Sequence, residues 1–246
     1  MDLAASLTIE PDHEAWLARA SQMVVDAATA AIEQRGRFLF ALSGGSTPTA
    51  LYERLAQSDR AGLIDWSSVV ILFGDERCVP PDDPASNYAM ARRALLDRVP
   101  IPPAQVHRME GELLPASAAQ RFHQVLVALG PDEHEPPAID LVLLGLGDNA
   151  HTASLFPGLS WRARPEELVI DEYVEVVQQW RLTLTPRTIA AARSVLFLVE
   201  GSGKADAVAA VLDGTIDPVQ GPARAVLEQT PTSWLLDAAA ASKLSR

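Results

Sequence analysis

Short apolar runs alternate along the chain with longer segments in which apolar residues recur at helical spacing. The short runs are typical of strands buried on both faces of a parallel sheet, and they lie at 37–42, 69–73, 139–144 and 195–199. The longer segments predict amphipathic helices, which we expect at 14–34, 49–57, 87–97, 116–129, 186–192 and within 201–214. Alternating, β-branched segments predict further strands at 172–177 and 181–185, with a short strand at 233–236 and a terminal helix at 238–244.

Strands separated by helices predict βαβ units. The expected fold class is therefore α/β, a three-layer Rossmann-like fold with a mostly parallel central sheet flanked by helices. A length of 246 residues suits one large α/β domain or two small ones. The segment PDEHEPP at 131–137 could be a linker, but an apolar strand starts two residues later. We therefore expect a surface loop there and a single domain over residues 1–246.

Composition narrows the class of protein. The net charge of −12 argues against nonspecific nucleic-acid binding, which needs a basic surface, but a few local cations can still serve an anionic substrate. Cys78 is the only cysteine, so neither an intrachain disulfide nor a cysteine metal cluster is possible. The first residues lack the pattern of a signal peptide, and no apolar run is long enough to span a membrane. We expect a cytoplasmic protein that does not bind membranes.

The segment LVLLGLGDNAHTASLFPG at 141–158 carries the strongest functional signal. Its apolar strand ends in glycines, which allow a sharp turn and close approach to a ligand, and His151 follows shortly after. Ligands of open α/β sheets bind at the carboxyl ends of the strands, and a histidine there can act as a general base near neutral pH. The simpler interpretation is that His151 caps a loop or the next helix.

The loop SGGSTP at 43–48 follows another predicted strand and precedes a helix. Its glycines expose backbone N–H groups, and the helix N-terminus attracts anions. We therefore predict that Gly44, Gly45, Ser46 and Thr47 cradle a phosphate, although an ordinary turn with a Ser or Thr N-cap would have the same composition. The loop lacks the Gly-Lys-Ser/Thr ending of a P-loop.

Two more loops follow buried strands. In GDER at 74–77, Asp75 and Glu76 could accept hydrogen bonds from sugar hydroxyls and Arg77 could bind a carboxylate or phosphate, or the loop could be a salt-bridged turn. Lys204 opens a helix, where a cation is unfavourable unless an anion lies between; otherwise it is a solvated lysine. Arg181 begins a strand and could serve the same anion.

These loops should meet at one edge of the sheet and form a pocket for a small, phosphorylated, hydroxyl-rich ligand. No metal site is expected, because the five histidines are scattered without HxxxH or HExxH spacing. A Ser-His-Asp hydrolase is unsupported as well, since no GxSxG motif is present.

Several stretches resemble the 6-phosphogluconolactonase family: LSGGSTP, GDERCVPPDDPASNY, DLVLLGLG, HTASLFPG and VLFLVEGSGKADAV. The resemblance covers most of the chain. It implies hydrolysis of 6-phospho-D-glucono-1,5-lactone to 6-phosphogluconate, in the oxidative pentose phosphate pathway, without metal or organic cofactor. It also implies that His151 activates water as general base and that the SGGST loop, Arg181 and Lys204 hold the 6-phosphate. We expect a monomer or weak dimer.

The chain departs from the family pattern beside the histidine. The family usually has Asp-Gly-His, and here the residues are Asn149, Ala150 and His151. Asn149 could orient the imidazole but could not neutralise its protonated form. The catalytic set predicted from the residues and the resemblance is His151, Asn149, Arg77 and Asp75, with Arg77 or backbone donors for the oxyanion. The alternatives are a sugar-phosphate isomerase or deaminase of the same fold, with Asp75 as base, and a non-catalytic sugar-phosphate-binding module.

Overall fold

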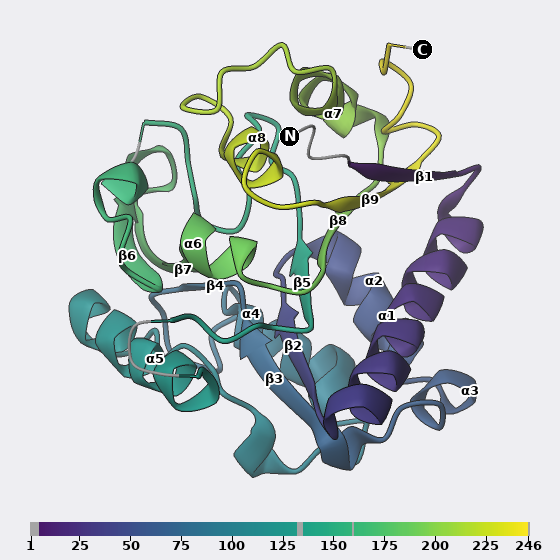
Figure 1. Ribbon diagram of the computed structural model, residues 1–246, viewed down its shortest axis with the longest axis vertical. Coiled ribbons are helices and arrows are strands. Elements are labelled where there is room, and N and C mark those ends of the chain that lie inside the picture. The colour runs from purple at the N-terminus through teal and green to yellow at the C-terminus, as the bar shows by residue number, and fades with distance from the viewer. Residues whose placement is uncertain (1–4, 132–134, 159, 246) are drawn as a thin grey trace.

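Six parallel strands form the central sheet of the computed structural model, which describes residues 5–131, 135–158 and 160–245, without the side chain of Ser160. Every pairing in this sheet is parallel, which confirms the predicted fold class (Figure 1). The strands, in spatial order, are β1 (Ser6–Glu10), β9 (Ser233–Asp237), β8 (Val195–Val199), β5 (Leu141–Leu144), β2 (Phe38–Leu42) and β3 (Val69–Phe73).

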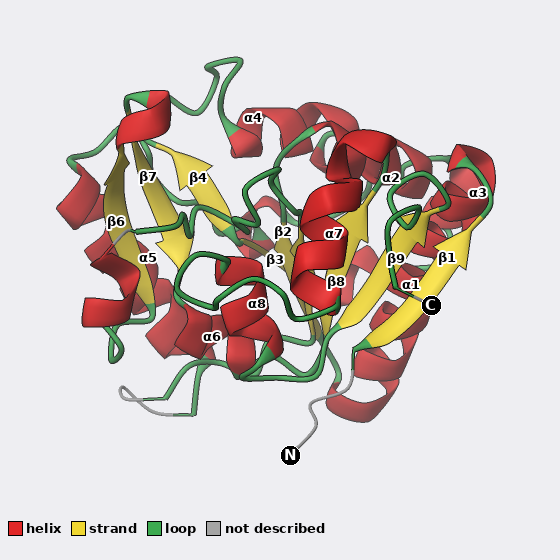
Figure 2. Ribbon diagram, turned by 90° about the horizontal axis from the view of Figure 1, so that it is seen from above, coloured by secondary structure: helices red, strands yellow, loops and turns green. Residues whose placement is uncertain are grey.

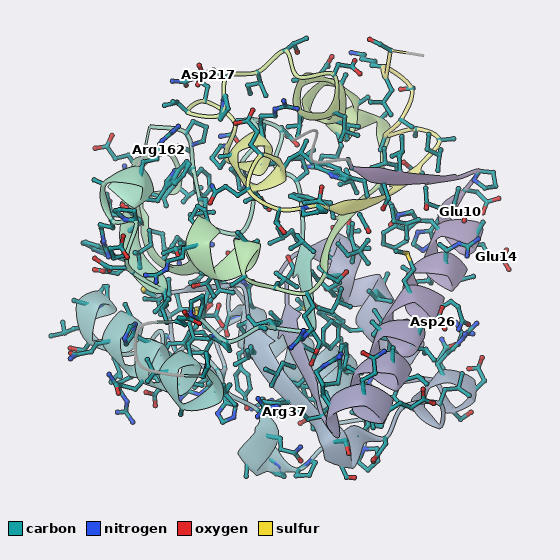
Figure 3. All side chains as sticks on the ribbon, in the orientation of Figure 1. Glu10, Glu14, Asp26, Arg37, Arg162 and Asp217 are labelled. Carbon is teal, nitrogen blue, oxygen red and sulfur yellow. The ribbon has the colours of Figure 1, made fainter. Side chains whose placement is uncertain are left out.

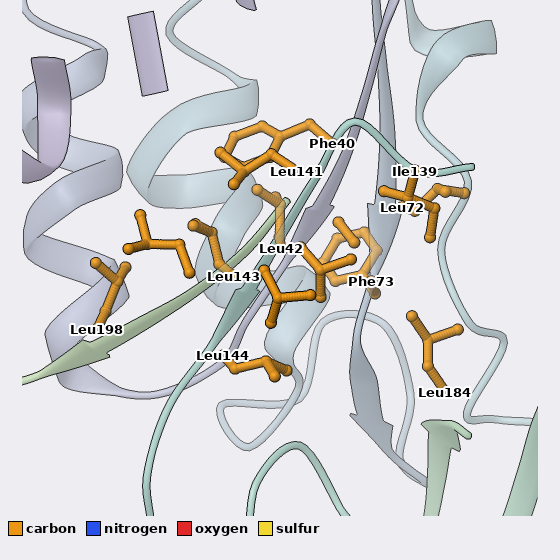
Figure 4. Packing of buried hydrophobic residues seen from close by; sticks show 14 of the residues in the cluster. Phe40, Leu42, Leu72, Phe73, Ile139, Leu141, Leu143, Leu144, Leu184 and Leu198 are labelled. Carbon is orange, nitrogen blue, oxygen red and sulfur yellow. The ribbon is translucent and has the colours of Figure 1, made fainter. Parts of the chain in front are cut away.

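The middle strands β2, β5 and β8 are buried at every position, as expected for a sheet covered on both faces. Figure 4 shows Phe40 and Leu42 of β2 packed with Leu141 and Leu143 of β5. Helices α1 (His13–Arg35) and α2 (Ser46–Leu55) lie on one side of the sheet, and α7 (Ala205–Leu212) lies on the other (Figure 2). The charged residues labelled in Figure 3 lie at the periphery. The remaining α-helices are α3 (Ser58–Ala61), α4 (Asn87–Ala91), α5 (Pro115–Leu129), α6 (Pro186–Ala190) and α8 (Pro222–Leu227).

A second, antiparallel sheet was not predicted. It consists of β4 (Asp75–Arg77), β7 (Gln179–Leu184) and β6 (Val169–Val174), in the order β4-β7-β6. The expectation of a loop at 74–77 is wrong at Asp75–Arg77, because these residues pair with β7. The strand expected at 172–177 is also shifted: β6 pairs from Val169 onward, and Glu175–Val177 form a 3-10 turn at the tip of the hairpin.

Other differences lie at the ends of the chain and in short elements. Strand β1 was not predicted, because its apolar Leu7 and Ile9 remain about half exposed and only pairing with β9 makes it a strand. Residues 238–243 form turns, and no helix forms over the expected range 238–244. The helix expected at 87–97 is α4 followed by a π-helical turn, Arg92–Leu96. Part of the loop expected at 131–137 lies outside the described residues. Across the described ranges, no helix combines the length and apolar character needed to cross a membrane.

Candidate active site

A cavity of about 570 Å³ opens where the carboxyl ends of the parallel strands meet the antiparallel sheet. It joins segments that are far apart in the chain: the loop after β2, strands β4 and β7, the loop after β5, and the turn after β8. Most of the predicted site residues line it, namely Gly44, Gly45, Asp75, Arg77, Asn149, His151, Arg181 and Lys204. The predicted convergence of the loops is confirmed by this shared cavity.

Ser46 and Thr47 lie in an adjoining recess of about 170 Å³, together with Gly44, Gly45 and Lys204. Gly45 is the N-cap of α2 and has a φ of 106°, a conformation that favours glycine. No side chain caps this helix, so its first N–H groups remain available to an anion. The alternative interpretation, a Ser or Thr N-cap, is therefore wrong.

Tyr52, a buried residue of α2, holds the start of the SGGSTP loop at Ser43. The hydroxyl of Tyr52 donates to the carbonyl oxygen of Ser43 at 2.8 Å and accepts from the Ser43 amide at 2.9 Å. Burial raises the pKa of the Tyr52 phenol well above its ordinary value, so it stays protonated and keeps both bonds. At Gly44 a Cβ would lie 2.0 Å from Oδ1 of Asn87, so only glycine fits this position without displacing Asn87.

The imidazole of His151 is oriented by Asn149. Nδ1 of the ring lies 2.6 Å from Oδ1 of Asn149, and the backbone N–H of His151 donates to the same oxygen at 3.2 Å. Because an amide oxygen only accepts hydrogen bonds, the ring proton belongs on Nδ1 and Nε2 is left as the basic nitrogen. Asn149 therefore performs the orienting part of the role expected of an aspartate at this position.

The protonation of His151 is set by its surroundings. Burial lowers its pKa below the ordinary value; nearby Asp75 opposes this shift, while Lys204 and Arg181 add to it. A histidine with a lowered pKa is neutral at pH 7 and can accept a proton from water.

The buried carboxylate of Asp75 accepts from Oγ of Ser154 at 2.7 Å and from Nδ2 of Asn87 at 3.1 Å.

Glu76 lies on the other face of β4, because successive side chains of a strand point to opposite faces. Its buried carboxylate accepts from Oγ of Ser86 at 2.9 Å and from the backbone N–H groups of Asn87 and Tyr88 at 2.7 and 2.8 Å. Burial raises the pKa of Glu76, and these hydrogen bonds oppose the shift. Glu76 does not line the cavity, so the prediction that it binds sugar hydroxyls is wrong; it holds the start of α4 against β4.

Arg77 and Arg181 are direct cross-strand neighbours on β4 and β7. Like charges in this position repel each other, and burial together with Arg77 lowers the pKa of Arg181. Nε of each guanidinium is buried without a hydrogen-bond partner, although Arg77 also donates to the carbonyl of Ala85. Within the described ranges neither arginine has a carboxylate partner, so the pair is suited to an anion from the cavity.

Lys204 lies at the end of the 3-10 turn Ser202–Lys204 and is not simply solvated. Its ammonium group forms an ion pair with Asp148, and this interaction lowers the pKa of the Asp148 carboxyl. Asp148 is mostly exposed, so the pair is weakly held and Lys204 remains able to bind an anion in the recess beside Ser46.

Three further residues of the site were not singled out from the sequence: Asn87, Ser154 and Phe156. Asn87 lies in the stretch GDERCVPPDDPASNY, and Ser154 and Phe156 lie in HTASLFPG. Their place in these family-like stretches was the only feature of the sequence that pointed to them. In the described part of the chain, no group of three or more His, Cys, Asp or Glu side chains is placed to hold a metal ion.

Comparison with known proteins identifies the class. The model of the family described as glucosamine-6-phosphate isomerases/6-phosphogluconolactonase matches residues 11–234, and the chain belongs to this family. Proteins named 6-phosphogluconolactonase from Nostoc sp. and Mycobacterium tuberculosis are 41% and 40% identical to it. These matches cover 98% of this chain in both cases, and 98% and 99% of the relatives.

Solved structures agree with the fold. The 6-phosphogluconolactonase from Trypanosoma brucei superposes with a TM-score of 0.86 at 29% identity, over 99% of this chain and 100% of that one. A monomeric glucosamine-6-phosphate deaminase has a TM-score of 0.82 at 22% identity, over 97% of this chain and 99% of that one. The second likeness concerns the fold alone.

Proposed function

We propose that this protein hydrolyses 6-phospho-D-glucono-1,5-lactone to 6-phosphogluconate in the oxidative pentose phosphate pathway, with His151 as general base. The observation that carries the proposal is the geometry of His151: Nδ1 is engaged by Asn149, which leaves Nε2 to accept a proton in a cavity that also holds Arg77, Arg181 and Lys204. The relatives named 6-phosphogluconolactonase support the choice of substrate.

In the proposed mechanism, Nε2 of His151 takes a proton from water and the hydroxide attacks C1 of the lactone. The charge that develops on the carbonyl oxygen is stabilised by Arg77 or by backbone N–H groups of the glycine loops. The C1–ring oxygen bond then breaks, and the imidazolium returns its proton to the leaving oxygen. Asp75 supplies through space the negative charge that Asn149 lacks, which favours the transient imidazolium.

The 6-phosphate is assigned to the recess beside the cavity. Its donors are Gly44, Gly45, Ser46 and Thr47 with the uncapped N-terminus of α2. Lys204 borders both the recess and the cavity, and Arg181 lines the cavity. We therefore assign the phosphate end of the substrate to this recess and the lactone carbon to the side of the cavity near His151.

Replacement of Lys204 by alanine tests the phosphate site. We expect KM for the lactone to rise by about tenfold, more than kcat falls, because the lost contact is remote from the reacting carbon. Lys243→Ala is the matched control, since Lys243 also forms an ion pair with an exposed aspartate, Asp206, and does not line the cavity. An unchanged KM in Lys204→Ala would remove Lys204 from the phosphate site.

Replacement of Asn149 by aspartate tests the role of the amide. A carboxylate at 2.6 Å from Nδ1 stabilises the imidazolium, so the pKa of His151 rises and the acid limb of the pH profile of kcat/KM moves to higher pH. Activity is then present above this raised pKa and lost as pH falls through it. Asn149→Ala, which removes the acceptor, should lower the plateau of kcat/KM without that upward shift. An acid limb that does not move in Asn149→Asp would show that position 149 does not act on His151.

The assay that separates the candidate functions uses freshly generated lactone, corrected for spontaneous hydrolysis. An isomerase or deaminase would need a carboxylate base, and both oxygens of Asp75 already accept hydrogen bonds from Ser154 and Asn87. Ammonia release from glucosamine 6-phosphate would support the deaminase, and binding of sugar phosphates without turnover of either substrate would support the binding module. We expect enzyme-dependent lactone hydrolysis alone.

We further propose a single domain over residues 1–246 and a cytoplasmic monomer or weak dimer. One hydrophobic cluster contains residues from Trp16 in α1 to Ala240 near the end of the chain, which supports one folding unit. Sedimentation and cell fractionation test the oligomeric state and the location.

A further inference from the structure

The ring of Phe156 lies flat against the imidazole of His151. The ring centroids are 4.1 Å apart and the planes are inclined by 14°. Phe156 lines the cavity but is only 8% exposed, so one broad side of the imidazole faces an aromatic ring instead of water. Phe156 takes no part in the proton transfers proposed for His151.

The backbone that carries Phe156 is held on several sides. The indole Nε1 of Trp161 donates to the carbonyl oxygen of Phe156 at 3.1 Å. The preceding residue, Leu155, is tied to Thr152 by a backbone hydrogen bond of 2.9 Å, and the amide of Ser154 donates to Oγ1 of Thr183 on β7 at 3.3 Å. These hydrogen bonds fix the backbone of Phe156, so its phenyl ring can define the position of the His151 imidazole.

We propose that Phe156 is a positioning residue that fixes the plane of the His151 imidazole so that Nε2 points at the water attacking the lactone. The hydrogen bond from Nδ1 to Asn149 fixes one atom of the ring and leaves the ring free to tilt about that contact. A nearly parallel ring at 4.1 Å limits this tilt, because turning the imidazole out of its plane would drive one edge of it into the phenyl ring. The inference rests on the proposed function.

The same contact controls hydration of the base. The charged groups around His151 are Asp75 on β4, Arg181 on β7, Lys204 after β8 and Asp148 in its own loop, and burial has a larger effect on its pKa than any of them. Loss of the phenyl ring admits water to one face of the imidazole, while these charges stay in place. The pKa of His151 should then move upward toward its ordinary value of about 6.5.

The test compares Phe156→Leu with Phe156→Tyr, which keeps the ring. We expect the plateau of kcat/KM in Phe156→Leu to fall about tenfold through kcat, with KM nearly unchanged, since misalignment of a reacting group lowers the rate more than binding. We also expect the acid limb to move to higher pH, and Phe156→Tyr to restore both quantities. Phe122→Leu is the matched control, because Phe122 is buried in α5 and outside the cavity; it should lower the melting temperature only.

A second readout needs no substrate. Titration of the His151 Cε1–H resonance by NMR should give a higher pKa in Phe156→Leu than in the wild type and in Phe156→Tyr. If Phe156→Leu does not fold, Phe156→Met, which has similar volume and no ring, carries the same expectation for the plateau of kcat/KM, and Phe156→Ala carries the expectation for the pKa. A wild-type plateau together with a wild-type titration in either ring-free variant would overturn the proposal. A wild-type protein without lactone hydrolysis would instead overturn the proposed function, and the two failures are therefore distinguishable.

Discussion

Replacement of His151 by alanine is expected to lower kcat/KM on the lactone by ~10²–10⁴. Among the described residues that line the cavity, only His151 carries an imidazole. The loss of a general base removes proton transfer while leaving the phosphate and hydroxyl contacts intact. KM should therefore change much less than kcat. The measurement is the initial rate on freshly generated lactone, corrected for the spontaneous reaction.

His123→Ala provides the control for this substitution. His123 lies on α5 and does not line the cavity, so its loss should leave the kinetic constants as they are. If His151→Ala kept the wild-type kcat/KM, His151 would not be the general base. The lactone would then be attacked by hydroxide with assistance from the arginines alone.

Replacement of Gly147 by alanine is expected to lower kcat/KM by at least ~10², the order of loss that a shift of about 1 Å at a catalytic group can cause. A Cβ on Gly147 would lie 1.9 Å from Nδ1 and 2.0 Å from Cε1 of His151. The amide of Gly147 donates to the carbonyl of His151 at 2.8 Å, so the backbone cannot easily yield. The imidazole of His151 must therefore move away from its contacts with Asn149 and Phe156. Nε2 then loses its orientation toward the substrate.

The control for this substitution is Gly62→Ala, at the end of α3. There the nearest atom to an added Cβ is a backbone oxygen at 3.5 Å, an ordinary contact, and activity should not change. A fold shown intact by circular dichroism with wild-type kcat/KM in Gly147→Ala would mean that the position of His151 seen here is not the catalytic one.

The departure from Asp-Gly at positions 149 and 150 has a structural consequence as well as an electrostatic one. Ala150 has a φ of 61°, a left-handed conformation that costs a residue with a Cβ roughly 1–2 kcal/mol. Its side chain is buried, and its carbonyl accepts from the amide of Ala223 in α8 at 3.1 Å. Packing and this hydrogen bond hold the turn in the shape that glycine would adopt readily, so His151 keeps its place.

The electrostatic consequence is distributed over other elements. Asn149 fixes the tautomer of His151 but carries no charge. The negative charge that raises the pKa of His151 comes first from Asp75, on a strand of the second sheet, and to a smaller extent from Asp148. In the proposed mechanism, orientation of the ring and compensation of its charge are therefore separate tasks of residues from different segments.

Much of the site could be predicted because its signals are local. Gly44 and Gly45 stand between a buried strand and a helix, and this order alone places backbone N–H groups at a helix N-terminus. His151 follows the end of β5, and in a parallel sheet the ends of neighbouring strands meet at one edge. The apolar runs of β2, β3, β5 and β8 and the helices between them determine that sheet.

The tertiary structure decided the rest. The residues of β4 are too few for a periodic signal, and only pairing with the distant strand β7 shows that Asp75 and Arg77 face the cavity while Glu76 faces α4. The same pairing sets Arg77 opposite Arg181. Antiparallel register between distant segments, and the flat contact of Phe156 with His151, depend on packing across the whole fold. The sequence by itself therefore determined which chemical groups follow the parallel strands, and the second sheet decided which of the side chains at 75–77 and 181 face the cavity.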